Sequence, residues 1–225
     1  MSKTLLVGGI VSLSTVDYPD YIASVIFLQG CGWCCKYCHN QHLQPIELSQ
    51  SLPWEEILNL LSSRKGFIDG VVFSGGEPLI QEALPEAMLE VKNMGFKIGL
   101  HTAGAVPEML AKVVPLVDWI GFDVKNDFKE YDQITGVPNS GKAALQSLNI
   151  LIAANANFEV RITMYKSLDT LRIIELLKEL SSMGVRTVAL QKCRDNEVII
   201  VEHPIFSDKI LLEDISKYFD NFFIR

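Results

Sequence analysis

The stretch Cys31-Gly-Trp-Cys34-Cys35-Lys-Tyr-Cys38-His-Asn40 holds four of the five cysteines of this 225-residue chain within eight positions. Three of them, Cys31, Cys35 and Cys38, follow the spacing C-x3-C-x2-C. Thiolates are soft ligands that suit iron–sulfur clusters, zinc or copper(I), and a cubane cluster normally takes four cysteines. Because no fourth ligand is evident, the spacing predicts a cluster with one iron left open to a reacting molecule.

A structural zinc site is the alternative interpretation of the same stretch. Zinc takes four sulfur or nitrogen ligands, and Cys31, Cys35, Cys38 and His39 would supply them. A disulfide framework is disfavoured, because a chain of this length does not need such cross-links and adjacent cysteines pair poorly. Cys34 is expected to be a bystander thiol rather than a ligand.

The composition indicates one folded domain over residues 1–225. The chain is 48% hydrophobic and 21% charged, enough to form a sizeable core. Its net charge of −7 and the lack of a basic block argue against a nucleic-acid partner. No apolar run reaches the ~20 residues that span a bilayer, and the first residues lack a full signal peptide. Clustered cysteines without targeting signals indicate the cytoplasm.

Short apolar segments alternate with amphipathic ones along the chain. The expected strands cover residues 23–29, 70–74, 96–100, 118–122, 158–164 and 185–191, after a short strand and turn within residues 1–20. The expected helices begin at residue 53 and cover residues 81–94, 107–114, 142–154, 168–183 and 211–219, with a polar loop at 127–140 and irregular chain at 194–208. This alternation predicts βαβ units and a parallel sheet with both faces covered. Periodicity alone does not choose between an open barrel and a doubly wound sheet.

Polar or ligating residues follow each of the six expected strands. In chain order they are the cysteine stretch, Gly75-Gly-Glu-Pro78, His101-Thr102, Asp123-Val-Lys125, Arg161 with Thr163, and Gln191. The carboxyl ends of parallel strands meet at one edge, where barrel enzymes gather their catalytic groups. The pattern therefore predicts a ligand-binding site at that edge.

Several of these motifs together resemble those of the radical S-adenosylmethionine (SAM) superfamily. Tyr37, just before the last cysteine of C-x3-C-x2-C, and the Gly-Gly-Glu-Pro motif are typical of it. The flanks Asp17-Tyr-Pro19 and Ser24–Gly30 resemble the activating enzymes of glycyl-radical proteins, above all those of anaerobic ribonucleotide reductases. The likeness is strongest from Ser14 to Asn40 and weakens after Arg161. Cys34 departs from the motif.

The resemblance implies a partial (β/α)6 barrel of parallel strands with outer helices. It also implies a [4Fe-4S] cluster on Cys31, Cys35 and Cys38, whose open iron chelates the amino and carboxylate groups of SAM. Reductive cleavage of SAM then gives a 5′-deoxyadenosyl radical, which takes a hydrogen atom from a glycine of a partner enzyme. The cofactors carry this chemistry, while the protein orients and shields them.

The expected partners follow from the same resemblance. They are an anaerobic ribonucleotide reductase and a flavodoxin or ferredoxin as electron donor, with no nucleic acid and no membrane. Three alternatives stay open: an activase of another glycyl-radical enzyme such as pyruvate formate-lyase, a small-molecule radical SAM enzyme, and a zinc-stabilised binding module.

The resemblance assigns the SAM ammonium to the motif Gly75-Gly76-Glu77-Pro78, whose glycines allow the backbone to approach a ligand closely. Charge-assisted hydrogen bonds from the ammonium to Glu77 would be of the stronger kind. The alternative is an ordinary turn between a strand and a helix.

Asp123 and Lys125 resemble the DxK motif of glycyl-radical activases, and residues two apart on a strand point to the same side. We expect Lys125 to bind the SAM carboxylate and Asp123 to make polar contacts with SAM, the alternative being a solvated ion pair. Arg161 is costly to bury unpaired, so it either contacts SAM or forms a structural salt bridge. The remaining candidates, with less specific roles at the same site, are Tyr37, His101, Thr102, Gln191 and His203.

Overall fold

The computed structural model describes residues 5–47, 51–165, 168–195, 198–199 and 203–225. Its main sheet has eight strands in the order β1-β2-β3-β4-β5-β6-β7-β10. The strands are β1 (Val7–Ser14), β2 (Ala23–Leu28), β3 (Gly70–Gly75), β4 (Lys97–Thr102), β5 (Trp119–Asp123), β6 (Phe158–Met164), β7 (Thr187–Lys192) and β10 (Asn221–Ile224), with a separate hairpin of β8 (Arg194–Asp195) and β9 (Val198–Ile199). All neighbours in the main sheet are parallel except β1, which pairs antiparallel with β2.

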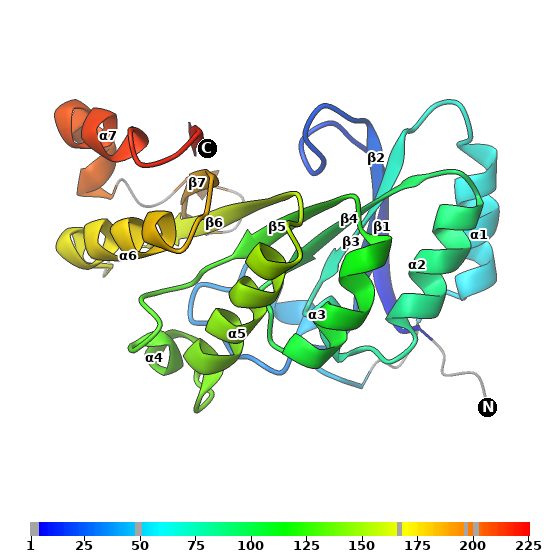
Figure 1. Cartoon of the computed structure of the whole chain (residues 1–225). Coiled ribbons are helices and arrows are strands. Elements are labelled where there is room, and N and C mark those ends of the chain that lie inside the picture. Colours follow the sequence, from blue (N-terminus) through cyan, green and yellow to red (C-terminus); the bar gives the residue numbers. More distant parts are fainter. Residues whose placement is uncertain (1–4, 48–50, 166–167, 196–197, 200–202) are drawn as a thin grey trace.

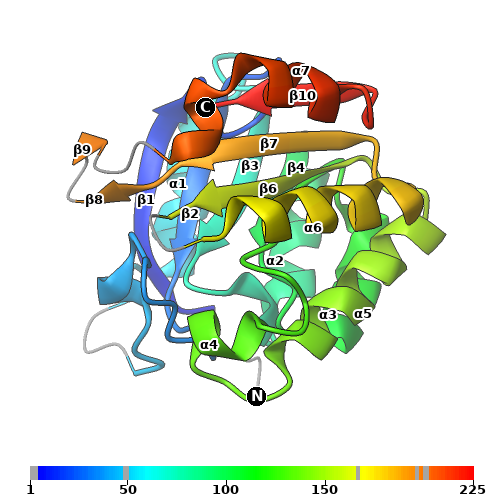
Figure 2. The ribbon, with the colours of Figure 1, turned by 90° about the vertical axis from the view of Figure 1, so that its left-hand side faces the viewer.

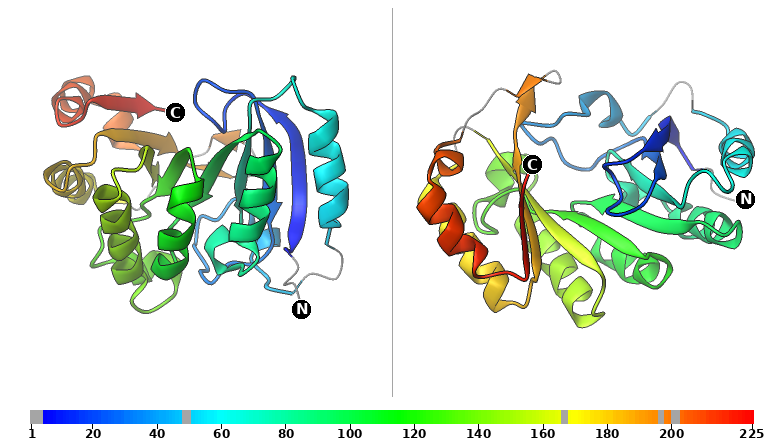
Figure 3. Two further views of the ribbon diagram at one scale, coloured as in Figure 1. Left: turned by 45° about the vertical axis from the view of Figure 1, so that its right-hand side comes forward. Right: turned by 90° about the horizontal axis from the view of Figure 1, so that it is seen from above.

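Helices cover the outer face of the sheet, which curves into an incomplete barrel (Figures 1 and 3). The α-helices are α1 (Trp54–Ser63), α2 (Leu84–Asn93), α3 (Pro107–Val113), α4 (Tyr131–Thr135), α5 (Ser140–Ala153), α6 (Thr170–Ser182) and α7 (Lys209–Ser216). The 3-10 helices are η1 (Gln41–Leu43), η2 (Pro78–Ile80), η3 (Val114–Leu116) and η4 (Pro204–Ser207). No described helix is both long and apolar enough to cross a membrane.

The six central strands confirm the predicted alternation and the parallel barrel, but two further strands extend the sheet. β1 lies at one edge as the predicted short N-terminal strand, whereas β10 at the other edge was not predicted. Figure 2 shows β10 beside β7, at the end of the sheet where α7 lies. The predicted loop at 127–140 was wrong in part, since α4 lies within it and α5 begins at Ser140. The expected irregular segment at 194–208 contains β8, β9 and η4 and otherwise lies partly outside the described residues.

Alternation along each strand separates two cores, because successive strand residues point to opposite faces. On β6, Val160 and Ile162 are fully buried in the large core between the sheet and the helices. Arg161, between them, and Thr163, after them, face the barrel interior. Tyr18, Val72 and Trp119 belong to a smaller cluster in that interior. Above this inner cluster, the interior is left to polar side chains.

Candidate active site

The cysteine stretch forms a loop that begins where β2 ends. Its start is held by backbone hydrogen bonds from Gly30 to Leu43 (2.8 Å) and from Cys31 to Gln44 (3.0 Å). Farther along, the amides of Cys34 and Lys36 donate to the carbonyls of residues 135 (2.8 Å) and 134 (3.2 Å) in α4. The loop is therefore fixed at its start and in its middle by neighbouring segments.

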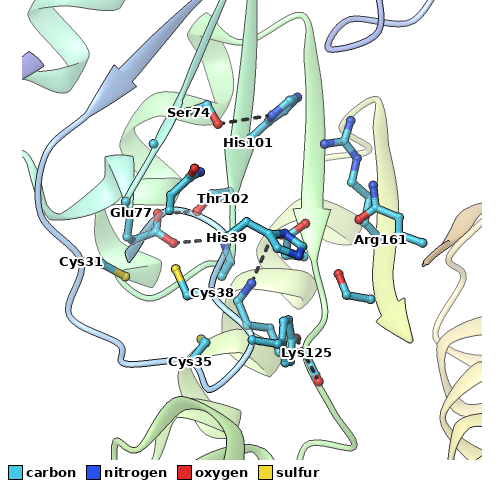
Figure 4. A pocket seen from close by; sticks show the side chains of 18 of the residues that line it. Cys31, Cys35, Cys38, His39, Ser74, Glu77, His101, Thr102, Lys125 and Arg161 are labelled. Atoms are coloured by element: carbon cyan, nitrogen blue, oxygen red, sulfur yellow. Dashed lines mark hydrogen bonds and ion pairs between the residues drawn. The ribbon is translucent and has the colours of Figure 1, made fainter. Parts of the chain in front are cut away.

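The thiols of Cys31, Cys35 and Cys38 face a common space at the wall of one cavity (Figure 4). All three are half-buried and free of disulfides, whereas Cys34 is exposed. Burial, with the nearby Glu77 carboxylate, raises the pKa of Cys31 to about 12, and burial also raises the pKa of Cys35. Such thiols stay protonated until a cation displaces the proton.

Three thiols at one cavity wall fit an iron–sulfur cluster, in which each thiolate would bind a different iron. Among the described residues, no group of three or more His, Cys, Asp and Glu side chains converges as the ligands of one metal ion do. In the zinc alternative, Cys31, Cys35, Cys38 and His39 would have to surround a single ion.

The Gly-Gly-Glu-Pro motif follows β3 and packs directly on the base of the cysteine loop. Gly75 has φ +121°, and a Cβ atom at Gly76 would lie 2.1 Å from the Gly30 carbonyl oxygen. The amide of Glu77 donates to that same oxygen at 2.8 Å. Only glycine fits this close contact.

Glu77 is buried at 2% exposure, and its carboxylate accepts three hydrogen bonds from within the chain. The donors are the Thr102 hydroxyl (2.6 Å), the Ala103 amide (2.9 Å) and the Leu79 amide (3.1 Å). Burial raises the pKa of Glu77 despite these bonds. Glu77 and Thr102 both lie on the cavity wall, but Pro78 does not, because it is buried at the start of η2.

His101, near the end of β4, connects the cavity to the segment after β1. Its Nε2 lies 2.8 Å from the Asp17 carbonyl oxygen, which can only accept, so Nε2 carries the proton. Nδ1 then accepts from the Ser74 hydroxyl at 3.4 Å. Burial and the charge of Arg161 lower the pKa of His101 to about 4. The imidazole is therefore neutral at neutral pH.

Asp123, the last residue of β5, and Lys125 form an ion pair of 3.2 Å, the contact that was the alternative to their expected contacts with SAM. Burial opposes the charge of Lys125, but the Asp123 carboxylate outweighs it and raises the pKa of Lys125 well above its usual value. Burial likewise opposes the charge of Asp123, but Lys125 and Arg161 lower the pKa of that carboxyl. Both groups are charged and on the cavity wall.

Arg161 on β6 makes the salt bridge that was one of its two predicted roles, with Glu159 at 3.1 Å. Glu159, 2% exposed, also accepts two hydrogen bonds of 2.9 Å from Arg225, the residue after β10. The Arg161 guanidinium lies 5.0 Å from the Trp119 ring centre and still faces the cavity. Gly121 leaves it room, since a Cβ atom there would lie 2.7 Å from the guanidinium carbon.

One cavity of about 770 Å³ brings the predicted residues together. Tyr37 lies on its wall, stacks on Tyr165 at 4.9 Å and donates a 3.4 Å hydrogen bond to the Lys125 carbonyl. Gln191 also lies on the wall. His203 does not, because it is buried and its Nε2 donates to the Leu168 carbonyl at 2.7 Å. Wall residues that the sequence analysis did not single out include Trp33, Asn40, Ser74, Lys192 and Arg225.

Comparison with known proteins matches residues 25–180 to the family model of the radical SAM superfamily. A protein of Methanocaldococcus jannaschii, named as a glycyl-radical enzyme activating enzyme, is 31% identical over 232 residues, covering 98% of this chain and 95% of its own. The pyruvate formate-lyase-activating enzyme of Clostridium pasteurianum is 34% identical over 144 residues, covering 60% of this chain and 59% of its own.

Solved structures share the fold at low sequence identity. SuiB of Streptococcus suis, bound to S-adenosylmethionine, matches 88% of this chain and 48% of its own with a TM-score of 0.67 and 15% identity. QueE of Escherichia coli matches 97% of this chain and 92% of its own with a TM-score of 0.60 and 17% identity. These neighbours confirm the predicted barrel.

Proposed function

This chain belongs to the radical SAM superfamily, and from that premise we propose that it is an activating enzyme, which generates a glycyl radical in a partner enzyme. Members of the superfamily use a [4Fe-4S] cluster and SAM. The similarity to the archaeal activating enzyme runs over nearly the whole of both chains. The observation that carries the proposal is the cavity of about 770 Å³, whose wall combines three thiols free of disulfides with most of the residues expected to bind SAM.

We assign the cluster to Cys31, Cys35 and Cys38 and leave Cys34 without a ligand role. When bound, the cluster supplies the electron that cleaves SAM. The three half-buried thiols favour this assignment, since all of them line the cavity and none is in a disulfide. Cys34 is exposed and absent from that wall.

We assign SAM to the rest of the wall. The glycine carbonyls of residues 75 and 76 and the Glu77 carboxylate accept from its ammonium group. Lys125 donates to the carboxylate of SAM. The Asp123 carboxylate raises the pKa of Lys125, so the ammonium group stays charged for this contact. Glu77 also accepts three hydrogen bonds within the chain, and through them it holds the turn after β3 against the end of β4.

The other predicted residues complete the walls. Arg161 offers its guanidinium, aligned by Glu159, to anionic or polar parts of the ligand. Tyr37 presents its ring beside the cysteine loop, for contact with the adenine. His101 acts through its hydrogen bond to Asp17, which holds the segment after β1 at the cavity, while Thr102 orients Glu77.

In the proposed reaction one hydrogen atom leaves the Cα of a partner glycine and ends on 5′-deoxyadenosine, so that the radical remains on the glycine. We propose an anaerobic ribonucleotide reductase as the partner and a flavodoxin or ferredoxin as the electron donor. The similarity to pyruvate formate-lyase-activating enzymes favours pyruvate formate-lyase as the second candidate partner.

The test is anaerobic reconstitution with iron and sulfide, followed by electron paramagnetic resonance of the reduced protein with and without SAM. Candidate partners are then added, and the spectrum is searched for a glycyl-radical doublet together with 5′-deoxyadenosine. Cys31→Ser, Cys35→Ser and Cys38→Ser should each abolish the SAM-dependent signal, whereas Cys34→Ser is the matched control that should retain it.

Each outcome separates the candidates. A doublet with only one of the two partners identifies it. If 5′-deoxyadenosine forms and a metabolite is altered, but neither partner shows a glycyl-radical doublet, the protein is a small-molecule radical SAM enzyme and not an activase. Zinc without sulfide in the purified protein would overturn the proposal altogether.

A further inference from the structure

The short helix α4 contacts two parts of the site that are about 90 residues apart in sequence. Its carbonyls at residues 134 and 135 accept from the amides of Lys36 and Cys34 in the cysteine loop. Its first residue, Tyr131, is fully buried, and its hydroxyl contacts the backbone on both sides of Val124.

The Tyr131 hydroxyl makes two hydrogen bonds of defined direction. It accepts from the Lys125 amide at 3.0 Å and donates to the Asp123 carbonyl at 3.3 Å. These bonds fix the backbone that carries the ion pair of Asp123 and Lys125. Burial raises the pKa of Tyr131, so the hydroxyl keeps its proton and remains a donor.

The Tyr131 ring contacts the cysteine loop as well. The ring of Trp33, in the middle of that loop, lies edge-on to it at 5.7 Å between centres, and Phe128 stacks on it at 5.9 Å. Trp33 is 4% exposed and also forms part of the cavity wall. One side chain therefore touches both the cysteine loop and the Asp123–Lys125 turn.

We infer that Tyr131 is a positioning residue, through which α4 sets the placement of Lys125 relative to the cysteine loop. Tyr131 does not lie on the cavity wall and acts only through these neighbours. The inference deepens the proposed function and rests on it for the roles of Lys125 and the cysteines as ligands.

The decisive variant is Tyr131→Phe, which keeps the buried ring and removes only the hydroxyl. The matched control is Thr135→Val in the same helix, because it also removes one buried hydroxyl. That hydroxyl contacts Ser140, the Tyr131 carbonyl and the Val137 amide, but neither Lys125 nor Asp123. A purely structural role for α4 predicts similar effects of both variants, whereas a positioning role predicts that they differ.

The first measurement is hydrogen exchange on protein without cluster or SAM. We expect Tyr131→Phe to raise exchange of the amides at residues 123–126 at least fivefold and Thr135→Val to leave it within twofold. Trp33→Phe tests the other contact and should raise exchange at residues 31–38 while sparing 123–126. Unchanged exchange at 123–126 in Tyr131→Phe would overturn the inference, whatever the protein's activity.

The second measurement is SAM affinity of the reconstituted protein, with iron content determined in parallel. Tyr131→Phe should keep its iron and weaken SAM binding about tenfold, while Thr135→Val stays within twofold of the unmodified protein. An equal loss of SAM affinity in both variants would mean that α4 has only a structural role. If the unmodified protein binds no cluster, the proposed function fails, but the exchange experiment still decides whether Tyr131 fixes the Asp123–Lys125 turn.

Discussion

In the proposed function Lys125 donates to the carboxylate of SAM, and Asp123 fixes the charge and the position of this lysine. A hydrogen bond to a charged group contributes about 1.5–3 kcal/mol, which corresponds to roughly a 10- to 100-fold change in affinity. Lys125→Met should therefore weaken SAM binding by that factor while leaving the iron content unchanged. Equilibrium binding to the reconstituted protein measures it.

The matched control for this prediction is Lys129→Met, four residues later and away from the cavity wall. It should bind SAM as the unmodified protein does. Equal weakening in both variants would mean that net charge, rather than the placement of Lys125, governs binding.

His101 makes the stability of the protein depend on pH in a defined direction. The unfolded chain takes up a proton on this imidazole below its ordinary pKa of about 6.5, whereas the folded protein resists it until about pH 4. The contribution of His101 to stability is thus highest above pH 6.5 and falls as the pH drops toward 4. Between pH 7 and pH 5 this one group should cost about 2 kcal/mol.

The test is urea unfolding of cluster-free protein at pH 7 and pH 5. His101→Asn should lose about 2 kcal/mol less than the unmodified protein over this interval, since it no longer titrates. The same substitution at exposed His42 is the control. An unchanged pH dependence in His101→Asn would show that the imidazole is not the responsible group.

Sequence reasoning at the residue scale succeeded where chemistry depends on local spacing. The i, i+2 rule predicted that Asp123 and Lys125 share a side, and it could also have found Glu159 beside Arg161 on β6. The rule could not find Arg225, because its contact with Glu159 depends on tertiary structure: β7 lies between β6 and β10 in the sheet and sets their distance. The placement of His203 at the site could not be judged from local spacing either, since its burial depends on contacts with residues distant in sequence.

At the scale of elements, the turn after β3 and the cysteine loop form one unit held by backbone contact. A Cβ atom at Gly76 would lie within 3 Å of three backbone atoms, belonging to Gly30 and Leu43. Neither backbone segment can yield cheaply, so Gly76→Ala should cost about 2–4 kcal/mol and lower the melting temperature by roughly 10 °C. It should also impair cluster reconstitution.

Gly32→Ala is the matched control, because it lies in the same loop with no atom within 4 Å of the added Cβ and no positive φ. We expect its melting temperature to change little and its iron content to stay the same. If both glycine variants melt alike, the close contact does not limit stability.

Sequence periodicity predicted the helices that have several turns and the strands that have a continuous run of buried residues. All six central strands were found, and β6 within residues 158–164 was found at its observed bounds. α4 was missed because five residues carry too little periodicity, and Tyr131 is buried by tertiary contacts. β10 was missed because a four-residue strand with only three apolar residues is a weak signal on its own.

At the scale of the whole molecule, the barrel interior is filled by a residue from outside the barrel strands. Tyr18, 3% exposed, enters from the segment between β1 and β2 and stacks on Trp119 at 5.6 Å. Gly70 and Gly99 leave room for it, since a Cβ atom at either would lie 3.1–3.3 Å from the Tyr18 ring. Small residues on β3 and β4 thus allow one aromatic ring to fill the space below the polar cavity.

This arrangement predicts that Tyr18 stabilises the entire barrel and not only its own segment. Tyr18→Ala should cost about 3–5 kcal/mol, as for other large buried aromatic residues, and lower the melting temperature by roughly 6–20 °C. Because Asp17 is tied to His101, the variant should also weaken SAM binding by freeing one wall of the cavity. Thermal unfolding followed by circular dichroism and SAM titration measure both effects.

Tyr218→Ala, at a 39% exposed tyrosine beyond α7, is the control. Equal melting temperatures for the two variants would mean that the barrel strands alone fill the interior, and that the segment after β1 serves only the cavity above it.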